Sequence, residues 1–131
     1  MKEKRRIFRT SVGVGRHKVN LVLMLMGRDV IAAISGGERP HVGAVAVAIP
    51  RPSSKDASKL SSTSSVFTLV GHRDDGVARM ASEELAKKLN RVAVVSAGIH
   101  MEKASEADIR KLVGNAEKAV KEVIRIFLNQ K

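Results

Sequence analysis

Residues 44–49 read Ala44-Val45-Ala46-Val47-Ala48-Ile49, a β-strand sequence in which large residues alternate with alanine. Because side chains point to alternate faces of a strand, Val45, Val47 and Ile49 fill one face and alanine lines the other. The alanine face allows unusually close approach, so we expect a helix, or the sheet of another chain, to pack against it. We predict a buried central strand that ends at residues 50–52, where two prolines cannot donate to a ladder.

The residues before this strand predict three further strands. Polar and apolar residues alternate over residues 8–14, which is typical of an edge strand with one solvated face. Residues 18–26 continue as a second strand, and the Gly27-Arg28-Asp29 turn leads into a third over residues 30–35. The second and third segments predict an antiparallel hairpin that ends at Gly36-Gly37.

The residues after it alternate between loop, strand and helix signals. Serine dominates residues 53–65, which predicts a flexible, solvated loop; the alternative is a hydroxyl-rich lid over an anionic ligand. A short strand is expected over residues 66–70 and a buried strand over residues 91–97. Between them, residues 74–90 have helical spacing and begin with two aspartates, which suit the positive end of a helix.

The last predicted element is an amphipathic helix that begins near Ser105. Ser105 and Asp108 have the spacing of an N-cap and its reciprocal partner. Apolar residues then recur at the i, i+3, i+4 and i+7 positions of one face: Ile109, Leu112, Val113, Ala116, Val120, Val123, Ile124 and Phe127.

The order of these elements predicts an α+β fold, with a mixed, largely antiparallel sheet and two helices packed on one face. The length of 131 residues suits a single domain over residues 1–131, with a basic, flexible arm at residues 1–6 and a serine-rich loop at residues 51–65. The sheet face without helices could support self-association, so we expect a homo-oligomer.

Composition bounds the cellular setting. The chain has no cysteine, which excludes disulfides, Cys-ligated zinc and thiol catalysis and gives no sign of an oxidising compartment. Charged residues interrupt the N-terminal region before a signal-peptide core can form. The apolar runs are far shorter than the roughly 20 residues that span a membrane. We therefore expect a cytoplasmic protein without a membrane segment.

The charge is strongly basic and concentrated at one end. The formal net charge is +11, and residues 1–18 hold seven Lys or Arg residues against one Glu. Such a region attracts phosphates or acidic surfaces without selecting among them. A basic nucleic-acid-binding domain is therefore one alternative, but with three phenylalanines and no Trp or Tyr the chain offers few side chains for base stacking.

Three glycine-flanked histidines are the best candidates for a site. His41 lies in Gly36-Gly37-Glu38-Arg39-Pro40-His41-Val42-Gly43, His72 in Gly71-His72-Arg73-Asp74, and His100 in Gly98-Ile99-His100. Flexible amides beside a guanidinium and an imidazole suit a phosphate or carboxylate, and the second motif lies at a strand-to-helix junction that favours anions. The simpler interpretations are a hairpin turn for the first motif and a helix cap for the second.

A metal-dependent, hydrolase-like enzyme is another alternative. The three histidines, with Asp74 or Asp75, have metal-binding chemistry, and His72 could serve as a base. The local two-His spacing of a zinc helix and the Gly-x-Ser-x-Gly elbow are both missing from the sequence. Catalysis is not established by these residues.

The ordered set of motifs resembles a known family. Gly36-Gly37-x-x-Pro40-His41-x-Gly43-Ala44, then Gly71-His72-x-Asp74, then Ala97-Gly98-Ile99-His100 before a C-terminal helix is similar to the small D subunits of non-oxidative hydroxyarylic-acid decarboxylases. These are prenylated-flavin chaperone-like proteins. The resemblance extends from about Val12 to Leu128.

This resemblance implies a non-catalytic accessory protein that supplies or stabilises prenylated FMN, or FMN, for a UbiD-type decarboxylase. The phosphate would be held by the Gly36-Gly37 amides with Arg39 and His41, or by the His72-Arg73 junction, while the ring packs on aliphatic side chains. No catalytic or metal-binding residue is assigned. The residues predicted to bind the flavin are Gly36, Gly37, Arg39, His41, Gly43, Ser64, Ser65, His72, Arg73 and His100.

Overall fold

Six strands and two α-helices form the structure, a computed structural model that describes residues 5–69 and 73–130. A short 3-10 turn, η1 (Gly15–His17), separates the first two strands. In chain order the other elements are β1 (Ile7–Val12), β2 (Val19–Met26), β3 (Asp29–Gly37), β4 (Ala44–Pro52), β5 (Leu60–Thr68), α1 (Asp74–Leu89), β6 (Ala93–His100) and α2 (Glu106–Leu128).

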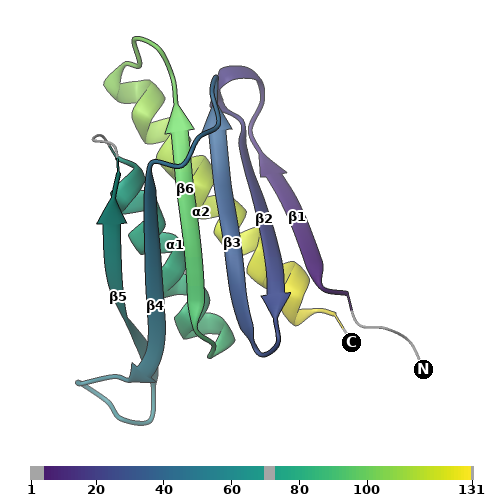
Figure 1. The fold of residues 1–131 in the computed structure, drawn as a ribbon, viewed down its shortest axis with the longest axis vertical. Coiled ribbons are helices and arrows are strands. Elements are labelled where there is room, and N and C mark those ends of the chain that lie inside the picture. Colours follow the sequence, from purple (N-terminus) through teal and green to yellow (C-terminus); the bar gives the residue numbers. More distant parts are fainter. Residues whose placement is uncertain (1–4, 70–72, 131) are drawn as a thin grey trace.

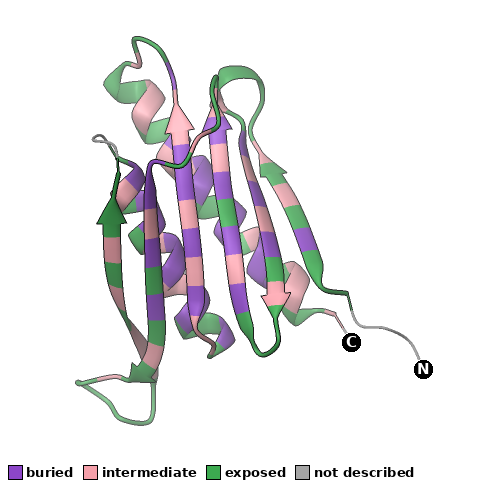
Figure 2. Cartoon of the chain, in the orientation of Figure 1, coloured by how far each residue is buried: buried purple, intermediate pink, exposed green. Residues whose placement is uncertain are grey.

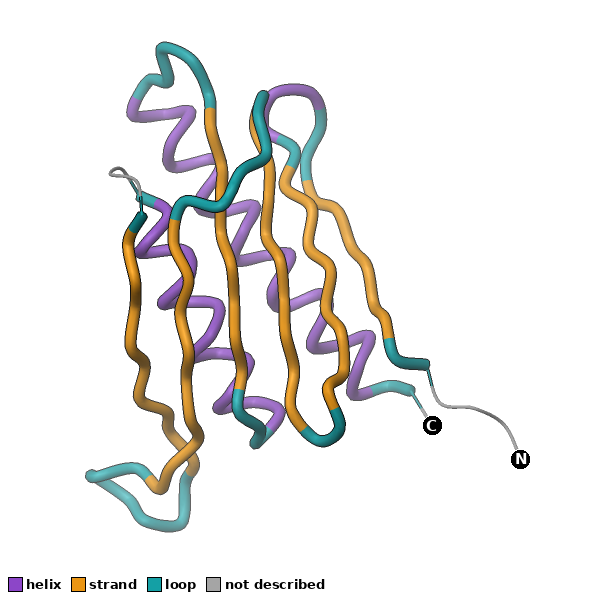
Figure 3. The backbone as a smooth tube through the Cα atoms, viewed as in Figure 1, coloured by secondary structure: helices purple, strands orange, loops and turns teal. Residues whose placement is uncertain are grey.

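The strands form one mixed sheet in the order β1-β2-β3-β6-β4-β5. The β3–β6 pair is parallel and the other four pairs are antiparallel. Both helices lie behind the sheet in the view of Figure 1, and the backbone trace in Figure 3 shows the same two layers. This arrangement confirms the predicted α+β fold with two helices on one face.

The alanine face of β4 is covered by a helix of the same chain. Ala44, Ala46 and Ala48 are fully buried, and α1 packs on β4, β5 and β6. The helix also buries small residues, Ala78 and Ala81, so the two layers can come close together. Figure 2 shows buried residues alternating along β4 with residues that are not. The strand is therefore buried on one face only, not on both as the sequence suggested.

Two predicted boundaries around β5 are wrong. β4 runs through both prolines to Pro52 and pairs with β5 over its whole length. The pairing of β4 with β6 ends at Ala48 and Ala93. On that side of β4 no strand needs a hydrogen bond from residues 50–52, so the missing N–H groups of the two prolines cost nothing there. The serine-rich segment is a strand from Leu60 onward, which leaves only residues 53–59 as a loop.

Hydrogen bonds to α1 explain how so polar a segment forms a strand. The Ser62 hydroxyl donates to the backbone carbonyl of Glu83 at 2.9 Å, and the Ser64 hydroxyl donates to the Glu83 carboxylate. These contacts take the place of apolar packing on the helix-facing side of β5. The serines therefore belong to the sheet, and the alternative of a hydroxyl-rich lid is also wrong.

The start of α2 is fixed by the predicted capping box. The Ser105 hydroxyl accepts from the Asp108 amide, and the Asp108 carboxylate accepts from the Ser105 amide, both at 3.0 Å. His17, in η1, lies 2.8 Å from the other Asp108 oxygen. The hydrogen bond from the Ser105 amide, followed by those from the His17 and Ser105 side chains, lowers the pKa of Asp108 well below its ordinary value.

We expect this cap to make stability sensitive to acid. Because the pKa of Asp108 is lower in the folded chain, its contribution is complete above the ordinary carboxyl pKa and is lost as the pH falls through the folded value. The free energy of unfolding should therefore decrease below about pH 4, the ordinary range of an Asp carboxyl. Asp108→Asn should show a smaller decrease between neutral and acid pH in urea unfolding than the wild-type chain.

Asp75→Asn is the matched control, because Asp75 lies in the first turn of the other helix. It should keep the acid sensitivity of the wild-type chain. Equal acid sensitivity of Asp108→Asn and the wild-type chain would contradict this account of the cap.

No helix in the described part of the chain combines the length and the apolar character that crossing a membrane requires.

Candidate functional site

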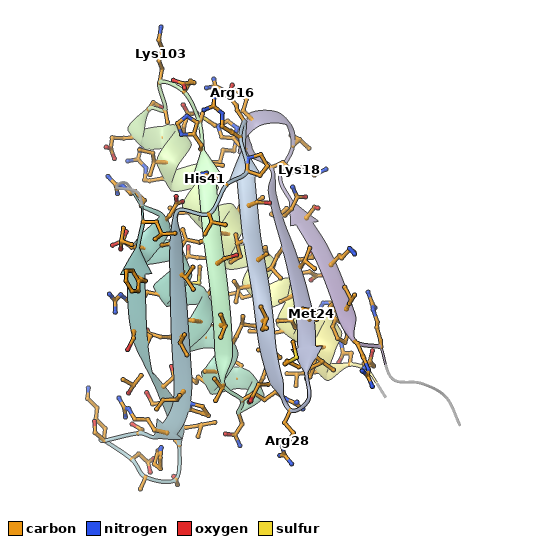
Figure 4. The ribbon with its side chains drawn as sticks, in the orientation of Figure 1. Arg16, Lys18, Met24, Arg28, His41 and Lys103 are labelled. Carbon is orange, nitrogen blue, oxygen red and sulfur yellow. The ribbon has the colours of Figure 1, made fainter. Side chains whose placement is uncertain are left out.

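A cavity of about 970 Å³ opens between the first turns of α1, the first half of α2 and the end of β6. His41, which Figure 4 labels near this end of the sheet, lies in the loop between β3 and β4. The polar residues that line the cavity, beside Gly76, are Arg39, His41, Arg73, Asp74, Asp75, His100 and Glu117. The apolar residues are Val77, Met80, Ile99, Met101, Ala104, Ile109 and Val113.

The cavity brings together residues from all three predicted motifs. Parallel pairing of β3 with β6 places Gly37 opposite His100, at the point where the loop to His41 begins. The rings of His41 and His100 are 6.3 Å apart between centroids and nearly perpendicular. Arg39 and Arg73 line the same cavity. His72 lies outside the described residues.

A buried carboxylate holds His41 in place. Asp74 is 4% exposed, and its Oδ2 lies 3.1 Å from Nε2 of His41. Its Oδ1 accepts the backbone N–H of Ile99 at 3.0 Å. Asp74 therefore joins the start of α1 to β6 and to the β3–β4 loop. This role was missed in the sequence, where Asp74 was read as a helix cap or a metal ligand.

Three glycines allow the backbones at this site to approach one another. A Cβ at Gly43 would overlap the Asp74 carboxylate, and one at Gly98 would overlap the carbonyl of His41. Gly37 has a φ of +70°, and a Cβ there would overlap the carbonyl of His100. Because Gly98 lets the β3–β4 loop pass, β6 continues to His100 instead of ending at Ala97 as predicted.

Two of the glycines predicted to bind the ligand use their amides in hydrogen bonds to the backbone instead. The Gly37 amide donates to the carbonyl of Lys18 at 3.1 Å, and the Gly43 amide donates to that of Ala97 at 2.9 Å. Gly36 is buried, and a Cβ there would overlap the Lys18 carbonyl. The interpretation of the Gly36-Gly37 pair as a phosphate-binding amide cradle is therefore wrong, because these glycines serve close packing.

The two serines of the predicted site lie elsewhere. Ser64 bonds to Glu83 on α1, and Ser65 is exposed on β5 opposite Val47. Neither is among the described residues that line the cavity.

Ion pairs and hydrogen bonds connect the rim of the cavity. Arg73 lies 3.7 Å from Glu106, which links the starts of the two helices. His100 lies 3.2 Å from Glu102, whose backbone amide donates to Glu38 at 2.8 Å. This role of Glu38 could not be predicted from the sequence, because its hydrogen-bond partner lies 64 positions away.

The apolar side chains that line the cavity were not predicted from the sequence either. Ile109 and Val113 belong to the apolar stripe of α2 and were interpreted as core, whereas Met80 falls beside the stripe of α1. The strand-end histidines and arginines therefore face a surface formed by both helices. This combination suits a ligand with an anionic group and an apolar body.

The described residues of the cavity include no cluster of side chains suited to a metal ion. Among residues 5–69 and 73–130, no three His, Asp or Glu side chains come together in a way that could hold a metal ion.

Comparison with solved structures shows a shared fold. A chain in the crystal structure of a novel chaperone complex for yeast 20S proteasome assembly is similar to this chain, with a TM-score of 0.55 and 14% sequence identity. The match covers 94% of this chain and 96% of that one. At this identity the likeness concerns the fold alone.

Comparison with protein families gives a more specific result. Curated proteins gave no match. The family model for the prenylated flavin chaperone LpdD-like domain matches residues 13–128, which is nearly the whole chain. This match confirms the family indicated by the ordered glycine and histidine motifs. The chain belongs to the family of LpdD-like prenylated flavin chaperone domains.

Proposed function

We propose that this chain is a non-catalytic accessory protein that binds prenylated FMN, or FMN, in the cavity between α1 and α2 and supports a UbiD-type decarboxylase. The observation that carries the proposal is the composition of the cavity. Arg39, His41, Arg73 and His100 line it together with the apolar side chains of the two helices. A flavin mononucleotide has the matching division into a charged phosphate and a largely apolar ring system.

The phosphate is assigned to the histidine and arginine side chains. Guanidinium groups bind phosphate oxygens in a forked geometry, and Arg39 and Arg73 both line the cavity. The sequence suggested two alternative phosphate positions, one around His41 and one around Arg73. Because both residues line the same cavity, we treat them as parts of a single phosphate site.

The ring system is assigned to the apolar wall of Met80, Ile99 and Val113. The cavity volume of about 970 Å³ lies within the range of small-molecule sites, roughly 300–1,000 Å³. The chain has no Trp or Tyr to stack on an isoalloxazine ring. Aliphatic and thioether contacts favour temporary binding and transfer to a partner over permanent retention.

Absorbance titrations with prenylated FMN, FMN and riboflavin test the proposal. We expect a shifted visible spectrum with both phosphorylated flavins and much weaker binding of riboflavin, which lacks the phosphate. His41→Ala and Arg73→Ala should each weaken FMN binding about tenfold or more, because a hydrogen bond to a charged group contributes about 1.5–3 kcal/mol.

Arg9→Ala is the matched control for Arg73→Ala, because Arg9 is an exposed arginine on the edge strand β1. It removes the same charge far along the chain from the cavity residues and should leave affinity unchanged. Equal affinity for FMN and riboflavin, or no spectral change with any flavin, would overturn the proposed site.

Support of a decarboxylase needs a separate measurement. We expect the flavin-loaded chain, mixed with a UbiD-type decarboxylase purified without cofactor, to restore decarboxylation faster than the same concentration of free prenylated FMN. Restoration at the same rate would argue against a delivery role while leaving flavin binding intact.

A further inference from the structure

The sheet face opposite the helices carries a continuous band of apolar side chains. In register across the sheet, Ile7 pairs with Met24, Met24 with Ile31, Ile31 with Val94, and Val94 with Val47. Figure 2 shows this face, free of helices, with green and pink positions along every strand. The band therefore runs from the edge strand β1 to β4 on the side of the sheet that the helices leave open.

A second band lies beside the first. Val22 pairs with Ala33, and Val45 pairs with both Ser96 and Phe67. Phe67 is 74% exposed and Val47 is 42% exposed, although both are large apolar residues in strands. A shallow hollow of about 360 Å³ lies over β4 and β5, lined by Val45, Phe67 and Leu69 among others. Exposed apolar patches of this extent mark interaction surfaces.

Charge is scarce on this face. Within the six described strands, the outward-facing positions hold only three Lys, Arg, Asp or Glu residues: Arg9, Asp29 and Arg51. Arg9 lies on the edge strand β1, Asp29 begins β3, and Arg51 lies near the end of β4. In the whole chain, 28% of residues are charged. An apolar centre with charge confined to its margin is the composition of a protein interface.

We propose that a second copy of this chain covers the face, so that two sheets pack against each other in a homodimer with the helices outside. Two copies, each with a net charge of +11, repel one another over most of their surfaces. The open face is where this repulsion is smallest, because its centre carries no charged side chain. A two-fold interface brings identical patches together, and an uncharged apolar patch is complementary to itself.

The size of the face fits such a dimer. Six strands at a spacing of about 4.8 Å, each with about eight residues that rise about 3.3 Å, give a flat area of roughly 760 Å². Side-chain relief increases the accessible area toward the roughly 800 Å² per partner that a stable interface buries. The flavin cavity lies on the helix side of the sheet, so dimerisation leaves it open.

Sedimentation equilibrium of the full chain tests the proposal. One chain has a mass of 14.2 kDa, so a homodimer should sediment with twice this mass. Val47→Arg places a charge on the apolar band at a position that is already 42% exposed, and should convert the dimer to a folded monomer. Ile49→Arg, on the same face and 51% exposed, should do the same and serves as the second variant.

Val14→Arg is the matched control, because Val14 is 83% exposed and lies in the turn before η1 instead of on the sheet. It should remain dimeric. A wild-type chain that sediments as a monomer over the whole concentration range would overturn the proposal, as would arginine variants that stay dimeric. The proposal would also be overturned if the arginine variants kept the mass of the wild-type chain and lost only their binding to a decarboxylase, because the face would then bind that partner. Flavin titration of each variant separates this result from the proposed function, since dissociation should leave cavity binding intact.

Discussion

Replacing Gly98 with alanine is expected to lower the free energy of unfolding by about 2–4 kcal/mol, the range of severe overpacking. The added methyl group would overlap the carbonyl of His41, where the β3–β4 loop passes β6. Because backbone cannot yield as a flexible side chain does, the loop must move, and the contact between His41 and Asp74 is disturbed. Urea unfolding measures the loss of stability. In FMN titrations under conditions where the variant is folded, it should bind FMN more weakly than the wild-type chain does.

Gly114→Ala is the matched control for this substitution. Gly114 lies within α2, and a Cβ there would meet no atom within 4 Å apart from its chain neighbours and the nearby backbone of its own helix. Alanine should raise the free energy of unfolding by about 0.5–1 kcal/mol, because glycine is the poorer helix former. If Gly98→Ala were as stable as Gly114→Ala, the close backbone approach at His41 would be contradicted.

Asp74→Ala is expected to cost about 2–3 kcal/mol of stability and most of the flavin affinity. The substitution leaves the Ile99 amide without its acceptor, and an unpaired buried polar group costs about 1–3 kcal/mol, more when a charged partner is removed. It also releases His41, which then no longer has a fixed position in the cavity. Unfolding in urea and titration with FMN measure the two effects on the same preparation.

Asp74→Asn separates positioning from simple loss of packing. The asparagine oxygen can still accept from Ile99, so the loss of stability should be about 1 kcal/mol or less. Its amide keeps His41 near its place, and flavin affinity should recover most of the way. If both variants bound FMN as tightly as the wild-type chain, Asp74 would not be a positioning residue of the site.

The elements with strong periodicity were predictable from the sequence. The apolar stripe of α2 and its Ser105–Asp108 cap are local features, and the structure confirms both. The alanine face of β4 predicted the close approach of a helix or of another chain's sheet, and the structure has the helix α1 there. In each case residues near one another in the sequence determine the structure that forms.

β5 could not be recognised because its support comes from another element. Its serines have little apolar surface, and the strand is held by pairing with β4 and by hydrogen bonds to Glu83. The prolines of β4 likewise have a place in the sheet only because pairing with β6 has already ended at Ala48. Tertiary contacts override local propensity at both positions.

The candidate site was predictable in its residue types but not in its geometry. The sequence indicated Arg39, His41, Arg73 and His100, which do line one cavity. The sequence could not assign the glycines, since whether an amide meets a ligand or a neighbouring strand depends on pairing between distant segments. The parallel pairing of β3 with β6 is one example, because it places Gly37 opposite His100 although the two residues are far apart in the sequence.

The most direct test of the account is a crystal structure of the chain with prenylated FMN. We predict that the phosphate lies within hydrogen-bond distance of at least two of Arg39, His41, Arg73 and His100, and that the ring contacts Met80 and Val113. A flavin bound on the open face of the sheet, or anywhere outside the cavity between α1 and α2, would contradict the central claim.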